Sequence, residues 1–257
     1  MWQCQTCGNN VAETDTYCSE CGVMIRKRNC PHCGFSLAPV SESCPKCGAD
    51  AVETGRFTDE RDGQVYRTVK IGNQIWMAEN LNYGKMTTNA KMSVGEKWCY
   101  NNDETMCSGG RGGFYSKDVA VESCPLGWHL PSNEEWNELF KTVGGVEIAG
   151  IMLKSRIGWQ PFWSHNHVAN GADVYGFSAI PTGDVFLHEL RHDDVRVEFG
   201  LLKRGCGFWS SDHGLDNYGH KTSHSVSFYE GSEILIHSDS YGIGRHGYGI
   251  RCLKNQL

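Results

Sequence analysis

Eight of the thirteen cysteines lie in the first 47 residues, and their spacing is regular. They form four Cys-x2-Cys pairs, each followed by glycine, and a unit of two pairs recurs after 26 residues. Two cysteines at this spacing can turn both sulfurs toward one point, and two such pairs supply the four thiolates that tetrahedral Zn²⁺ prefers. The pattern predicts two zinc ions, held by Cys4, Cys7, Cys18 and Cys21 and by Cys30, Cys33, Cys44 and Cys47.

A metal is also needed for each unit to fold. A segment of about 20 residues cannot bury enough apolar surface to fold alone, so the ion would supply the folding free energy. The alternative is disulfide bonding, which requires an oxidising compartment and would close four short rings that constrain the chain poorly. Because each repeat is complete by itself, pairing of ligands within a unit is favoured over interleaving. The spacing resembles the double zinc ribbon family over residues 1–48.

Charge bears on what such ribbons bind. Some zinc ribbons bind nucleic acid, and Arg26-Lys27-Arg28 lies between the two units. The whole chain is acidic, however, with a formal net charge of −6, whereas proteins that hold nucleic acid by bulk electrostatics are basic. We therefore expect the ribbons to serve as a structural or protein-docking module, and nucleic acid to be an improbable partner.

The composition is that of a globular protein, and neither a membrane span nor a secretory signal is apparent. The longest apolar run, Ile148 to Leu153, has six residues, whereas a transmembrane helix needs about 18. The sequence Met1-Trp2-Gln3-Cys4 contains neither the basic nor the apolar region of a secretory signal. We expect a cytoplasmic protein without a membrane partner.

After the cysteine-rich segment the pattern changes. Residues 49–57 show no clear periodicity and predict a linker. Asp62-Gly63 is a hairpin signal, apolar residues alternate over 65–71, and Gly72-Asn73 is a second turn. These features predict a three-stranded antiparallel start to a domain over residues 58–257.

Farther along, the pattern predicts two helices. Ser132 and Glu135 form a capping box, and Trp136, Leu139 and Phe140 follow at helical spacing up to Gly144-Gly145. A second helical stretch covers 146–154. Short strand-like pieces separated by Gly and Ser clusters follow, so the fold class is α+β.

The long motifs of this region are similar to those of the Fibrobacter succinogenes major paralogous domain. In chain order they are DGQVYRTVKIGNQIWMAENLNY, WCYNND, CPLGWHLPSNEEW, YGFSAIPTG, FWSS and GYGIRC. That family looks related to the C-type-lectin-like fold, which it would share with formylglycine-generating enzymes. The resemblance implies a C-type-lectin-like domain with two helices and a twisted antiparallel sheet, and it implies fold more than chemistry.

The resemblance also bears on the five later cysteines. It implies two disulfides, Cys99–Cys107 and Cys124–Cys252; in a reducing compartment the same cysteines would instead be small buried hydrophobic residues. Formylglycine-generating enzymes use two cysteines a few residues apart in the C-terminal segment. Here that segment holds only Cys206 and Cys252, which lie 46 residues apart, so we do not transfer that activity. Cys206 is expected to be a core residue.

A recognition surface is predicted from residues 209–250, which are rich in Ser, Asp, His, Asn, Tyr and Gly. Adaptable polar groups beside rigid aromatic rings are typical of binding surfaces, and in variable proteins of the C-type-lectin-like fold this segment faces the ligand. The residues expected to line the surface are Asp212, His213, Asp216, Asn217, Tyr218, His220, Tyr241, Arg245 and His246. An ordinary polar end of the domain is the competing interpretation.

Other candidates are weaker. Trp159 and Trp163 could form a platform for sugar rings or peptide, and the oxygen ligands of residues 101–104 could hold Ca²⁺. The leading hypothesis is a non-enzymatic binding protein with a protein or glycan ligand. The alternatives are an enzyme that uses loop histidines and carboxylates on the same scaffold, and a regulatory protein that acts through its ribbons.

Overall fold

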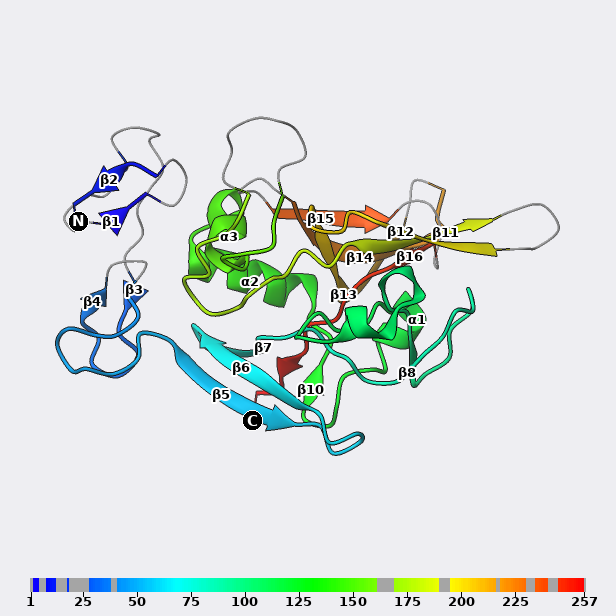
Figure 1. Ribbon diagram of the computed structural model, residues 1–257, viewed down its shortest axis with the longest axis horizontal. Helices are drawn as coiled ribbons and strands as arrows, with labels where there is room; N and C mark the ends of the chain where they lie inside the picture. The colour runs from blue at the N-terminus through cyan, green and yellow to red at the C-terminus, as the bar shows by residue number, and fades with distance from the viewer. Residues whose placement is uncertain are drawn as a thin grey trace.

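The protein is represented by a computed structural model of residues 1–257, shown in Figure 1. The structure describes residues 2–4, 8–12, 18, 28–37, 41–160, 169–189, 195–215, 218–229, 234–239 and 245–256. A cysteine-rich N-terminal part lies beside a larger domain. Among the described residues, no helix has the length and apolar character needed to cross a membrane.

The 26-residue repeat of the sequence recurs in the backbone of the N-terminal part. Strand β1 (Trp2–Gln3) pairs with β2 (Asn10–Val11), and β3 (Arg28–Asn29) pairs with β4 (Ser36–Leu37), both antiparallel. Each hairpin has a very small core. In the first it comprises Cys4, Val11 and Cys18, and in the second Cys30, Leu37, Cys44 and Ala51. Cores of this size support the inference that a metal provides the folding energy.

The larger domain begins with a five-stranded sheet. Its strands are β5 (Glu53–Thr58), β6 (Val65–Ile71), β7 (Gln74–Met77), β10 (Trp128–His129) and β17 (Leu253–Lys254). They lie in the order β10-β17-β7-β6-β5, and every pair in the sheet is antiparallel. The three-stranded start was predicted correctly, because the turns after β5 and β6 fall at the Gly-containing signals.

The segment 49–57, which the sequence predicts to be a linker, is divided between the two modules. Asp50 forms a β-bridge with Ser43, and Ala51 is buried in the second ribbon. Strand β5 then starts at Glu53, and Val52 between them packs against the core of the domain. The ribbon and the sheet are therefore directly continuous.

Three helices are present in the described part of the domain: α1 (Lys117–Ala120), α2 (Asn133–Val143) and α3 (Val146–Leu153). The capping box of α2 forms as predicted, because Ser132 Oγ accepts a hydrogen bond from the Glu135 N–H while the Glu135 carboxylate accepts one from the Ser132 N–H. Trp136 on the buried face of α2 packs against Trp76 of β7, with ring centroids 4.6 Å apart. Two 3₁₀ turns, η1 (Tyr100–Asn102) and η2 (Glu104–Cys107), precede α1.

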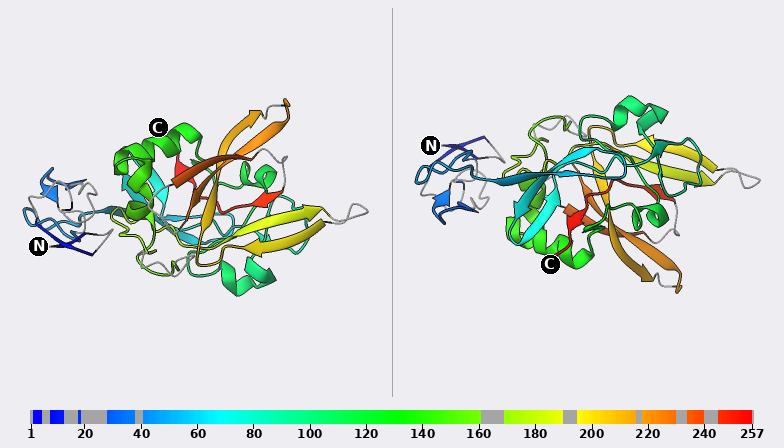
Figure 2. Two further views of the ribbon diagram at one scale, coloured as in Figure 1. Left: turned by 90° about the horizontal axis from the view of Figure 1, so that it is seen from above. Right: turned by 90° about the horizontal axis from the view of Figure 1, so that it is seen from below.

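Two further three-stranded sheets complete the far end of the domain. Strand β11 (Asp184–Glu189) lies between β12 (Val195–Gly200) and β16 (His246–Gly247); β14 (Lys221–Phe228) lies between β13 (Cys206–Leu215) and β15 (Ile234–Asp239). Their strands are antiparallel, whereas β8 (Lys85–Met86) and β9 (Glu96–Lys97) form a small parallel pair. Figure 2 shows the β11–β12 and β13–β14 hairpins extending away from the N-terminus and diverging from each other.

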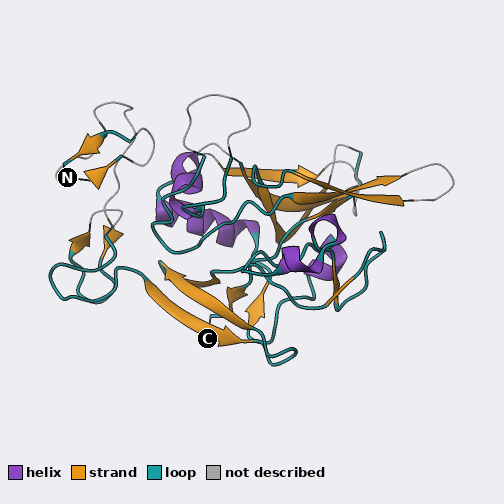
Figure 3. Cartoon of the chain, in the orientation of Figure 1, coloured by secondary structure: helices purple, strands orange, loops and turns teal. Residues whose placement is uncertain are grey.

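The described fold is mostly sheet with few helices, as Figure 3 shows, in agreement with an α+β class. The domain contains two disulfides, one local and one long-range. Cys99–Cys107 closes the loop that contains η1 and η2, and Cys124–Cys252 joins the segment before β10 to the segment before β17. These are the two pairs that the family resemblance implied. Cys206 is fully buried in the core.

The domain also contains buried cations whose partners are backbone carbonyls and, for Arg251, one side-chain amide oxygen. The Arg251 guanidinium donates to Asn80 Oδ1 (2.6 Å) and to the carbonyls of Phe177 and Ser178. Lys154 Nζ donates to the carbonyls of Ala169 (2.9 Å) and Tyr229 (3.0 Å). Because each cation bonds segments far apart in the sequence, these side chains fasten loops together across the core.

Candidate functional site

Four cysteines of the second ribbon converge on one point. The sulfurs of Cys30, Cys33, Cys44 and Cys47 all lie within 4.8 Å of one another. The Cys30–Cys47 pair is 3.7 Å apart and the Cys33–Cys44 pair 3.6 Å. Four sulfurs in a tetrahedron with Zn–S bonds of about 2.3 Å are about 3.8 Å apart, whereas a disulfide brings two sulfurs to about 2.05 Å. The observed spacing fits sulfurs arranged around an ion and not bonded to each other.

Two tight turns position these sulfurs. In the first, the Cys30 carbonyl accepts a hydrogen bond from the Gly34 N–H at 2.9 Å; in the second, the Cys44 carbonyl accepts one from the Gly48 N–H at 2.8 Å. Both glycines are left-handed, with φ of 71° and 72°, a conformation that glycine adopts without steric cost. The glycine after each pair is therefore what allows the turn to close.

The electrostatics of the cluster favour a bound cation. Burial raises the pKa of Cys30, but hydrogen bonds from the N–H groups of Cys33 and His32 and from neighbouring thiols bring it down to about 6. At Cys47 the Ala49 N–H lowers the pKa, but the neighbouring thiols of Cys33, Cys44 and Cys30, together with burial, raise it to about 12. Four adjacent thiolates need a positive charge among them, and a coordinated Zn²⁺ supplies it.

The first ribbon shows the same turn. The Cys4 carbonyl accepts a hydrogen bond from the Gly8 N–H at 2.8 Å, and Gly8 is left-handed with φ of 76°. Cys4 and Cys18 are buried next to Val11. Cys7 and Cys21 lie outside the described residues, so a second ion stays a prediction.

The predicted ligand surface is divided between two sheets. His213, Tyr218 and His220 are exposed on the β13–β14 hairpin. Arg245 and His246 lie at β16, which belongs to the sheet of β11 and β12. Three more of the predicted residues lie outside the described residues: Asp216, Asn217 and Tyr241.

Asp212 has a structural role that the sequence does not indicate. It is half-buried at the base of the β13–β14 hairpin, and its Oδ2 accepts a hydrogen bond at 2.7 Å from the N–H of Asn133, the first residue of α2. Its backbone carbonyl accepts another from Lys117 Nζ at 3.0 Å. The side chain therefore fixes the hairpin to the helix.

Two weaker candidates also have other roles. Trp159 is buried, and its indole N–H is shared between Ser155 Oγ (3.1 Å) and the Ala179 carbonyl (3.2 Å), so the expectation of an exposed platform is wrong for this residue. Trp163 lies outside the described residues. In the 101–104 loop the Asp103 carboxylate caps η2 by accepting hydrogen bonds from the Thr105 N–H and Oγ1.

Sequence reasoning missed a His–Glu pair. His129 Nε2 lies 2.8 Å from Glu135 Oε1, while its Nδ1 lies 2.7 Å from Asn255 Oδ1. Both ring nitrogens are engaged, so the pair holds β10 to α2 and to the C-terminal segment. No motif spacing could have indicated the contact with Asn255, which lies 126 residues from His129.

The comparisons with known proteins match the N-terminal ribbons and the larger domain separately. Residues 4–48 match the family model of the double zinc ribbon, and residues 69–254 match that of the Fibrobacter succinogenes major domain. The chain matches no curated protein and no solved structure. Since the second match covers well over half of its length, the chain belongs to the Fibrobacter succinogenes major domain family and carries a double zinc ribbon at its N-terminal end.

Proposed function

We propose that the protein is a non-enzymatic binding protein, in which two zinc-loaded ribbons are joined to a C-type-lectin-like domain that takes a protein or glycan ligand. The observation that carries this proposal is the exposed end of the β13–β14 hairpin. Tyr218 is 86% exposed there, and Leu215 is 69% exposed. His213 and His220 lie on the same hairpin. Large rings beside adaptable polar groups are typical of recognition surfaces.

The base of this hairpin is held firmly, which supports the same proposal. Lys117, buried beneath it, donates hydrogen bonds to the carbonyls of Ser210 and Asp212. The Asp212 carboxylate binds the start of α2. A surface carried on a fixed base loses less conformational entropy when it binds, so a given set of contacts produces a higher affinity.

The ribbons would hold two ions and act as a docking or stabilising module. Support comes from the tetrahedral sulfur spacing in the second ribbon and from the shared turn at Gly8 in the first. Zinc ribbons have rigid turns and little apolar core, so they present their surface without rearrangement.

The ligand surface is tested with a glycan array and with purified candidate protein ligands, using the full zinc-loaded chain. Tyr218→Ala removes the largest exposed ring of the hairpin and should weaken binding about tenfold or more, as for a central aromatic contact residue. Leu126→Ala is the matched control, because Leu126 is 97% exposed elsewhere on the domain. Unchanged affinity in Tyr218→Ala, with both variants folded, would contradict the placement of the site.

A further inference from the structure

Strand β5 (Glu53–Thr58) is an open edge of the five-stranded sheet. It is the outermost strand, and among the described residues no strand pairs with its outer side. Every residue of β5 is exposed except Phe57, which is half-buried. Figure 1 shows β5 running along the outside of the domain, directly after the second ribbon. Such an edge offers a row of backbone N–H and C=O groups to another extended chain.

The charges on this strand are unbalanced. Arg56 of β5 lies directly opposite Arg67 of β6 in the sheet register, and like charges in that position destabilise a pair of strands. Arg67 is compensated by Glu79, whose carboxylate lies 3.2 Å from its Nε. Arg56 makes no ion pair with any described residue. One carboxylate near Arg56 would therefore remove a repulsion that the fold leaves in place.

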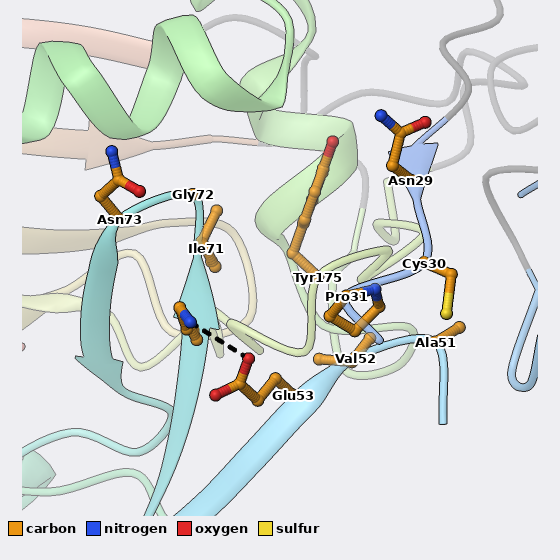
Figure 4. Close-up of a pocket in the computed structure, with 11 residues that line it drawn as sticks. Asn29, Cys30, Pro31, Ala51, Val52, Glu53, Ile71, Gly72, Asn73 and Tyr175 are labelled. Atoms are coloured by element: carbon orange, nitrogen blue, oxygen red, sulfur yellow. Dashed lines mark ion pairs between the residues drawn. The ribbon is translucent and has the colours of Figure 1, made fainter. Parts of the chain in front are cut away.

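The other face of the edge carries a shallow groove. A cavity of about 270 Å³ is lined by Phe57, Ile75 and Trp128, with Lys70 and Lys254 among its lining residues. Lys70 lies 3.3 Å from Glu53, and Figure 4 draws this ion pair as a dashed line at the labelled Glu53. Both residues line a second cavity, of about 320 Å³, which Asn29, Cys30 and Pro31 of the second ribbon also line. Lys254 makes no ion pair with the described residues. This face can take an apolar side chain and a further negative charge.

We propose that β5 is a docking strand for an extended acidic peptide segment of a partner protein, which adds to the sheet edge by backbone pairing. Main-chain hydrogen bonds would provide affinity, and alternate side chains would provide specificity. The side chains on one face of the added strand would bring a carboxylate to Arg56. The side chains on its other face would lie toward the groove at Phe57 and Lys254. This surface is separate from the β13–β14 hairpin, so the inference does not depend on the proposed function.

Two other occupants fit less well. A second copy of the chain could pair through its own β5, but Glu53 and Arg56 point to opposite faces of the strand. When two copies of β5 pair antiparallel and continue the sheet, directly opposite residues have their side chains on the same face of the sheet. Glu53 of one copy therefore cannot lie opposite Arg56 of the other. An acidic glycan would supply charge but has no row of amides to pair with the edge.

The experiment uses the full zinc-loaded chain and a fluorescent peptide of about eight residues, a common strand length, in which Glu and Val alternate. Fluorescence anisotropy should show that it binds at least about tenfold more tightly than a matched peptide of alternating Lys and Val. Two N-methylated forms of the acidic peptide test the backbone pairing. Methylation of one alternate set of amides should abolish binding and methylation of the other set should not, because only one row of an added strand faces the edge.

Arg56→Glu is the decisive variant, and Arg196→Glu, at an exposed position of β12, is the control with the same charge change. Arg56→Glu should weaken the acidic peptide about five- to tenfold. It should leave the melting temperature equal or higher, since Glu would then lie opposite Arg67. Equal binding of the acidic and basic peptides, tolerance of both methylation patterns, or tighter binding of polygalacturonate than of the peptide would overturn the proposal. Self-association that Arg56→Glu abolishes would also overturn it and assign the edge to a second copy.

Discussion

The second zinc ribbon and the large domain hold their turns in different ways. In the ribbon, four sulfurs from two short turns meet at one point, and the apolar core comprises four residues. In the domain, an aromatic core surrounds cations such as Arg251, which bind the carbonyls of segments more than 70 residues away. The ribbon depends on one strong, local and removable interaction. The domain depends on many weak interactions and on two disulfides, none of which a chelator removes.

This comparison predicts that the two parts lose structure separately when zinc is removed, which is the largest effect we expect. Structural zinc contributes about 10–16 kcal/mol of apparent binding free energy in zinc-finger peptides. Metal analysis should find two zinc ions per chain, and a chelator should unfold residues 1–48. Seven of the eight tryptophans lie after residue 50, so tryptophan fluorescence should still report a folded domain.

Two variants localise the second ion. Cys44→Ser should lose one zinc per chain, whereas Cys206→Ala, which changes a buried core cysteine outside the ribbons, should lose none. Absence of zinc from protein prepared in reducing buffer would contradict the site. Simultaneous unfolding of the domain on chelation would show that the two parts form one cooperative unit, joined through Val52 and the Arg156–Glu42 ion pair of 3.6 Å.

The second prediction concerns the largest buried cation. Arg251 is completely buried, and burial lowers its pKa to about 10, so it stays charged at neutral pH. Arg251→Met keeps much of the side-chain volume but leaves Asn80 Oδ1 and several carbonyls without a donor. We expect a loss of about 3 kcal/mol of unfolding free energy, the cost of unsatisfied buried polar groups. Urea unfolding followed by fluorescence measures it.

The matched control is Arg196→Met, since Arg196 is exposed on β12. Substitutions at exposed positions away from caps and networks usually change stability by less than about 0.5 kcal/mol. Equal stability of the two variants would show that the buried cation does not fasten the loops, and the contrast between ribbon and domain would then rest on apolar packing and on the two disulfides.

The same contrast explains which features of each region could be predicted from the sequence. The metal ligands were predictable because a zinc ribbon brings its cysteines together within a few residues, and the spacing itself is the signal. Strand β5 was predicted only in part, with residues 53–57 assigned to the linker, because an edge strand exposed along most of its length has no apolar alternation. Its pairing with β6 and the contact of Phe57 with Trp128 define it.

The buried charges and the cap at Asp212 were missed for a different reason. The Lys117 ammonium donates a hydrogen bond to the backbone carbonyl of Asp212, which lies 95 residues away in the sequence. No local sequence pattern marks a lysine that will be buried. Trp159 was assigned to a loop platform because its neighbours are polar, but its partner Ala179 lies 20 residues further on. Contacts of this kind depend on the assembled fold and not on the composition of the segment.

The last and smallest prediction concerns the protonation of a buried carboxyl group in the domain. Asp184 at the start of β11 is buried, and desolvation raises its pKa from 3.8 to about 7. Its Oδ1 has no hydrogen-bond partner among the described residues. Between pH 4 and pH 7 the folded protein holds a proton that the unfolded chain releases, so stability should fall as pH rises through this window and level off above it.

Asp184→Asn should remove this dependence and stabilise the domain at pH 8 by on the order of 2 kcal/mol. Thermal unfolding from pH 5 to pH 8 measures both effects, with Glu198→Gln as the control because its carboxylate is exposed on β12. A pH profile that is the same in Asp184→Asn and in the parent chain would show that Asp184 is already ionised and solvated, and that the domain tolerates a charge where its packing predicts none.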